Sequence, residues 1–109
     1  MTHKEVEDYL LSMPNAKLDY PFGKEVAVYK VNVSGEDKMF ALVTEGSDPV
    51  KISLKCDPKL AELLREKYIT VMGGYHLNKK HWNTVICSGQ LSEQEIYDLV
   101  RHSFELVKV

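Results

Sequence analysis

The residues best suited to contact a ligand lie in one short stretch, from Gly73 to Val85. This stretch holds the only Trp of the chain, a Lys pair and a Gly pair. Ammonium and imidazole groups, amide donors and aromatic rings are the groups that contact phosphates and stack on nucleic-acid bases. The predicted contact residues here are Tyr75, His76, Asn78, Lys79, Lys80, His81 and Asn83.

Two further lysines extend this predicted contact set. Lys51 and Lys55 alternate with apolar residues, so both lie on the polar face of a predicted strand. No acidic residue occurs between Glu66 and Glu93, which favours a locally positive surface. A structural interpretation stays open, because a Trp on a strand is typical of a core and a Lys pair in a loop is typical of solvated surface.

Motifs for catalysis and metal binding are absent from the sequence. There is no G-x-S-x-G, no H-E-x-x-H and no phosphate-binding glycine loop. His76 and His81 lack the helical spacing of a zinc site. We therefore predict a protein that is not an enzyme, with no catalytic residue, no metal and no cofactor. A minor alternative is a small-ligand or enzymatic pocket in which Cys56, at the start of a helix, converges with His76 and His81.

The overall composition is that of one globular domain spanning residues 1–109. The chain is 44% hydrophobic and 28% charged, without an apolar run long enough to cross a membrane. Its beginning is polar rather than signal-like, so we expect a cytoplasmic protein with no membrane partner. A net charge of −2 argues against nucleic-acid binding through the field of the whole molecule. Cys56 and Cys87 are expected to be unpaired thiols.

The hydrophobic periodicity predicts an α+β fold. Helices are expected over residues 2–13, 58–68 and from Ser92 nearly to the end, and strands over 25–33, 38–45, 50–55, 69–72 and 81–87. Thr2 and Ser92 are each followed by a Glu three residues later, which predicts capping boxes, and Asp57-Pro58 is typical of a helix start. The turn from Tyr20 to Gly23 is predicted to be a packed lid over the core rather than a binding element.

The resulting order is α-β(3)-α-β(2)-α, with two layers. One antiparallel sheet would be covered by helices on one face, and its other face would be partly open. An open sheet face is a usable binding surface.

Several segments together resemble the MmcQ/YjbR family over essentially the whole chain. They are Tyr20–Gly23, Leu54–Pro58, Leu64–Tyr68, Gly74–Val85 and Ser103–Val107. Gly73, where the family usually has Pro, and Phe104, where Tyr is common, are mild departures. The resemblance implies a CyaY-like fold, similar to type III secretion chaperones, with the same element order. It also implies predicted DNA binding through a "double-wing" motif, a label based on structural analogy.

The sequence and the resemblance together predict a small non-enzymatic domain that binds DNA weakly. Lys79, Lys80 and His81 would contact phosphates, and Tyr75, Asn78 and Asn83 would stack or hydrogen bond. Glu36 and Asp37, at the tip of the first hairpin, would repel phosphates. The alternative is a protein-interaction or chaperone-like module that uses the open sheet face.

Overall fold

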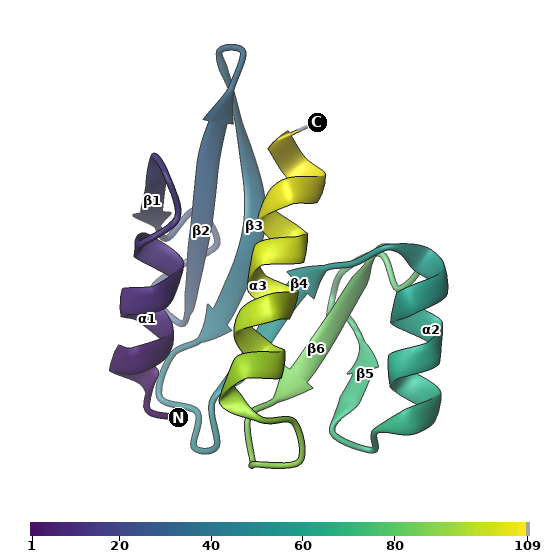
Figure 1. The fold of residues 1–109 in the computed structure, drawn as a ribbon. Helices are drawn as coiled ribbons and strands as arrows, with labels where there is room; N and C mark the ends of the chain where they lie inside the picture. The colour runs from purple at the N-terminus through teal and green to yellow at the C-terminus, as the bar shows by residue number, and fades with distance from the viewer. Residues whose placement is uncertain (109) are drawn as a thin grey trace.

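The computed structural model describes residues 1–108. Within them, three helices accompany one six-stranded antiparallel sheet of order β1-β2-β3-β4-β6-β5 (Figure 1). The elements are α1 (His3–Leu11), β1 (Ala16–Asp19), β2 (Val26–Val33), β3 (Glu36–Thr44), β4 (Lys51–Lys55), α2 (Pro58–Lys67), β5 (Val71–Gly73), β6 (Trp82–Ile86) and α3 (Glu93–Lys108). The predicted α+β class is confirmed.

The helices cover one face of the sheet, as Figure 1 shows. Helix α3 crosses the middle of the sheet, while α1 lies by β1 and β2 and α2 packs against β5 and β6. The main core lies between these layers. Its largest fully buried side chains include Leu10 of α1, Tyr29 and Phe40 of the sheet, and Val100 of α3. Phe104 meets the Phe40 ring edge to face, with 5.3 Å between centroids.

The helix starts follow the predicted capping chemistry. The Thr2 hydroxyl accepts from the Glu5 N–H at 3.1 Å, and the Glu5 carboxylate accepts from the Thr2 N–H at 2.9 Å. Ser92 and Glu95 form the same reciprocal pair at the start of α3. Asp57 accepts from two N–H groups in the first turn of α2. Each cap satisfies amide donors that have no partner inside the helix.

Strand β1 was not predicted from the sequence, because no strand was expected before residue 25. It pairs antiparallel with β2, from Ala16 opposite Val31 to Asp19 opposite Val28. With only four residues of alternating half-buried and exposed side chains, β1 has too short a pattern to predict a strand. Its partner β2 determines its conformation, so the observed order is α-β(4)-α-β(2)-α.

The other boundaries differ from the expected ones by at most two residues, as is usual at element ends. The difference that most affects the surface is at β5, which begins at Val71 rather than at residue 69. Ile69 is 90% exposed and precedes the strand. No helix within residues 1–108 is both long enough and apolar enough to cross a membrane.

The second face of the sheet carries a smaller apolar cluster. Val28, Leu42 and Trp82 are buried there, and Leu77 packs against them from the β5–β6 connection. This cluster is separate from the main core and has no helix over it (Figure 1). Trp82 therefore stabilises the sheet from its open side.

Candidate ligand-binding face of the sheet

The connection between β5 and β6 is a compact loop held by its own backbone. The Gly74 N–H donates to the Trp82 carbonyl at 2.8 Å, and the Trp82 N–H donates to the Asn78 carbonyl at 2.9 Å. His76 has φ of +57°, in the left-handed region that non-glycine residues rarely adopt. This turn places the Tyr75 and His76 rings 4.0 Å apart between centroids. The loop thus presents an aromatic pair on a defined backbone.

The glycine pair permits close packing in this loop. A Cβ at Gly74 would lie 2.7 Å from the Cβ of Trp82, and a Cβ at Gly73 would lie 2.9 Å from Cγ of Lys79. A larger residue at position 74 would clash with Trp82, which the strand holds in place. A larger residue at position 73 would meet only the Lys79 side chain, which is flexible and can move. The structure therefore gives Gly74 a packing role.

Arg65 of α2 fixes the loop from the helix-covered side. One guanidinium nitrogen, Nη1, donates to the Lys79 carbonyl and to Oδ1 of Asn83, both at 2.8 Å. The Asn83 amide donates in turn to the Ala61 carbonyl at 3.1 Å. Asn83 is 3% exposed, so the expectation that it contacts a ligand is wrong. Its position on β6 points it towards α2, where its amide satisfies buried partners.

An open hollow of about 850 Å³ lies on the helix-free face of the sheet. Its lining comes from the five strands β2 to β6 and from the loops at either side: Phe22, Glu25, Val26, Leu42, Thr44, Lys51, Ser53, Met72, Tyr75, His76, Leu77, Thr84 and Ile86. Tyr75 is 73% exposed and Phe22 is 64% exposed. The hollow combines apolar walls with a few polar groups, which is the usual character of a ligand site.

Apart from the buried Asn83, the predicted contact residues divide into three groups. Lys51, Tyr75 and His76 line the hollow, although 24 positions separate Lys51 from Tyr75 in the sequence. Lys55 lies on the same strand face as Lys51 and is half-buried, and it pairs in register with Trp82.

The remaining group lies on the loop beyond the hollow and comprises Asn78, Lys79, Lys80 and His81. Lys79 donates from Nζ to the Gly74 carbonyl at 3.2 Å, which ties it to the loop. Asn78 accepts from the Lys80 N–H at 2.9 Å and so shapes the turn. Lys80 is exposed, and within residues 1–108 its ammonium group has no acidic partner.

The turn from Tyr20 to Gly23 is not the predicted lid over the core. Phe22 projects beside the hollow on the other face of the sheet, and the Tyr20 hydroxyl donates to Glu45 at 3.1 Å. Strand β1 moves the turn to the sheet edge, because β1 leads directly into it after pairing with β2. The aromatic residues of this turn are consequently available to a ligand.

Sequence reasoning also missed several lining residues. Ser53 and Thr84 pair across β4 and β6, and their hydroxyl oxygens lie 2.7 Å apart in the hollow. Strand alternation places Ser53 on the same face as Lys51, so this residue was within reach of sequence analysis. Phe22 had no such signal, because only the fold brings it to the same hollow as Tyr75.

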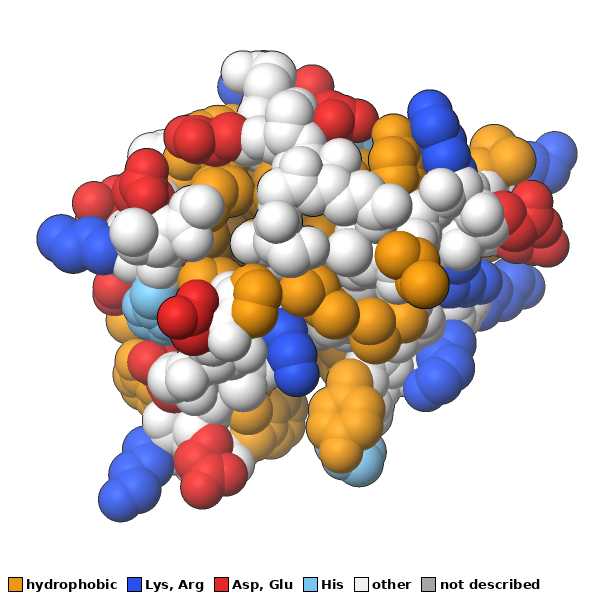
Figure 2. Space-filling model, turned by 90° about the horizontal axis from the view of Figure 1, so that it is seen from below, with side chains coloured by type: hydrophobic (Ala, Val, Ile, Leu, Met, Phe, Trp, Pro, Cys, Tyr) orange, Lys and Arg blue, Asp and Glu red, His pale blue; other side chains and the backbone are white. Residues whose placement is uncertain are grey.

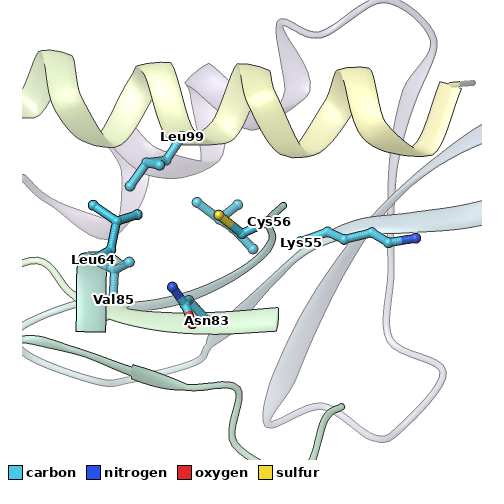
Figure 3. Close-up of a pocket in the computed structure, with 7 residues that line it drawn as sticks. Lys55, Cys56, Leu64, Asn83, Val85 and Leu99 are labelled. Carbon is cyan, nitrogen blue, oxygen red and sulfur yellow. The ribbon is translucent and has the colours of Figure 1, made fainter. Parts of the chain in front are cut away.

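Cys56 does not belong to this face. It lies beside a cavity of about 10 Å³ under α3, together with Leu64, Asn83, Val85 and Leu99, while the Lys55 side chain points away (Figure 3). Burial raises the pKa of the Cys56 thiol to about 11, so the thiol is protonated and a poor nucleophile at neutral pH. His76 lines the hollow on the opposite side of the sheet, so the converging pocket of Cys56, His76 and His81 does not form.

The charges are unevenly distributed. In Figure 2, Lys and Arg side chains gather on the right, the side of α2, β5 and β6, and acidic side chains gather on the left and at the top. At the β2–β3 hairpin, Asp37 accepts from Asn32 at 3.0 Å and from Lys17 at 3.3 Å. These bonds lower the pKa of Asp37, which stays ionised. The hairpin tip therefore keeps its negative charge.

The fold and this face define an α+β domain with one helix-covered and one open sheet face. The family model YjbR matches residues 11–106, so the chain belongs to the YjbR family. The YjbR protein of Escherichia coli strain K12 is 38% identical over 105 residues, which cover 96% of this chain and 86% of that protein. YyaQ of Bacillus subtilis strain 168 is 25% identical, with 99% of each chain covered.

Solved structures agree with this assignment. A crystal structure of a Deinococcus radiodurans protein superposes with a TM-score of 0.91 at 36% identity, covering 97% of this chain and 78% of that one. A Pseudomonas syringae protein gives a TM-score of 0.80 at 33% identity, covering 97% and 98%. The fold is therefore shared with experimentally determined structures of similar sequence.

Proposed function

We propose that this protein is a non-enzymatic domain that binds nucleic acid with its open sheet face and the adjoining loop. The observation that carries the proposal is that Lys51, Tyr75 and His76 come from separate parts of the chain and line one hollow. Cations and aromatic rings on one concave surface are the groups that recognise phosphate and base together.

The exposed cations next to the hollow support phosphate contacts. Lys51 and Lys80 are exposed and, in the described part of the chain, neither forms an ion pair. An ammonium group without an acidic partner exchanges its counterion for phosphate without breaking a protein contact. The β2–β3 hairpin, which carries acidic residues at its tip, does not contribute phosphate contacts in this proposal. The proposed binding mode therefore differs from a double-wing mode in which that hairpin would contact the DNA.

Salt-dependent binding tests the proposal. Fluorescence anisotropy of labelled DNA is measured from roughly 50 to 200 mM salt, where phosphate contacts weaken most clearly. Lys80→Ala and Lys51→Ala should each weaken binding and reduce the slope of log K against log salt by about 1. Lys4→Ala on α1 is the matched control, because Lys4 is exposed on the helix-covered side and should leave the slope unchanged.

A second candidate is a protein-interaction module that uses the same face. Phe22, Met72 and Tyr75 all line the hollow and are 64%, 40% and 73% exposed, and exposed apolar groups of this kind mark interaction sites. Absence of DNA binding even at low salt would contradict the first proposal. A partner retained from nuclease-treated lysate and lost with Tyr75→Ala would then favour the second.

A further inference from the structure

We propose that the hollow on the open face seats an unpaired base of single-stranded nucleic acid. This inference rests on the nucleic-acid binding proposed above, and it names the form of nucleic acid that the face selects. Four properties of the hollow support it: its size, its aromatic rims, its hydroxyl pair and the distribution of its charges.

The size and the walls suit a planar ring. A volume of about 850 Å³ falls within the roughly 300–1,000 Å³ of small-molecule sites, so a base and its sugar can enter. Val26, Leu42 and Ile86 form apolar parts of the lining, and Tyr75 and Phe22 reach it from separate loops. Each base has a π-face that gains contact by stacking on such rings, whatever its sequence.

Two hydroxyl groups supply hydrogen bonds inside the apolar lining. Thr84 Oγ1 accepts from the Tyr75 N–H at 3.2 Å and lies 2.7 Å from Ser53 Oγ. One of the two hydroxyl groups donates its proton to the other, so the proton of the accepting hydroxyl group is free to donate to a ligand. Ser53 Oγ also keeps acceptor capacity. The pair can therefore bond to a base edge, which carries both donors and acceptors.

The charges favour a single strand over a duplex. Lys51 and His76 line the hollow and can approach the phosphate of a nucleotide whose base is seated there, while Glu25 also lines the hollow. A carboxylate accepts hydrogen bonds from base amino groups but repels phosphates. In a duplex the base faces are stacked on one another, so this sheet face would meet only the sugar-phosphate backbone and the groove edges of the bases. The aromatic rings and apolar walls would then have no base face on which to stack.

Matched single-stranded and duplex DNA test this inference. Anisotropy is measured for a short labelled strand and for the same strand annealed to its complement, at one low salt concentration. We expect tighter binding of the single strand. Tyr75→Ala should weaken single-strand binding roughly 5- to 150-fold, the effect of losing one stacked base, while Tyr75→Phe should largely preserve it.

Control variants separate this inference from the proposed function. Ile69→Ala removes an apolar side chain that is 90% exposed but does not line the hollow, and it should leave binding unchanged. One outcome would overturn the proposed base site but leave the proposed nucleic-acid binding intact. In that outcome duplex and single strand bind equally, Tyr75→Ala has no effect on binding, and Lys80→Ala weakens it. If neither DNA binds, both proposals fail. If Tyr75→Ala abolishes binding of a protein partner but leaves DNA binding unchanged, the hollow is a protein-binding site and the proposed base site is wrong.

Discussion

Ser103 joins helix α3 to two strands through one buried hydroxyl group. It donates to the Phe40 carbonyl at 2.5 Å and accepts from the Lys55 N–H at 2.9 Å. Ser103→Ala leaves both backbone groups without this partner, so we expect the free energy of unfolding to fall by about 1–3 kcal/mol. Urea denaturation checks this, with the exposed Ser88→Ala as control, expected within about 0.5 kcal/mol of the parent. Equal effects of the two variants would contradict the assigned role.

At the scale of the element, the β5–β6 loop depends on the close approach of Gly74 to Trp82. Gly74→Ala places a methyl group 2.7 Å from the Trp82 Cβ, which belongs to a strand and cannot move freely. We expect a loss of about 1–3 kcal/mol in unfolding free energy from this overpacking. Gly73→Ala meets only the flexible Lys79 side chain and should cost clearly less. Thermal denaturation compares the two variants, and a larger loss for Gly73→Ala would show that the loop packs differently.

At the scale of the whole molecule, surface carboxylates couple stability to pH. The Lys30 ammonium, 2.7 Å away, and the Tyr20 N–H hold the pKa of Asp19 below its ordinary value, and Asn32 and Lys17 do the same for Asp37. Because the folded pKa is lowered, this stabilisation is present above the unfolded pKa of about 3.9 and is lost as the pH falls through the folded value.

We therefore expect the urea midpoint to decrease as the pH is lowered from neutral to below about 4. Asp19→Asn and Lys30→Met should each make this decrease shallower, because each removes the coupling of that carboxylate to folding. A pH dependence identical to that of the parent in both variants would show that the ion pair does not act on stability.

The sequence by itself determined the α+β class, the three helices and most of the strands. Local signals were sufficient for these: Thr2–Glu5 and Ser92–Glu95 cap their helices by contacts three residues apart, and Asp57-Pro58 starts α2. Alternation along β4 placed Lys51 and Lys55 together on one face. Such patterns are readable because the interacting groups are neighbours in the chain.

Only the tertiary structure decided which predicted contact residues share one surface. Strand β1 forms through pairing with β2, and it carries Phe22 to the open face instead of over the core. Asn83 is buried because Arg65 and Ala61, about twenty residues earlier, bind its amide. The position of a polar side chain at the surface or in the interior depends on partners that are distant in sequence. For that reason the sequence could predict that Tyr75 and His76 belong to a contact loop. Only the fold showed that both residues line the same hollow as Lys51.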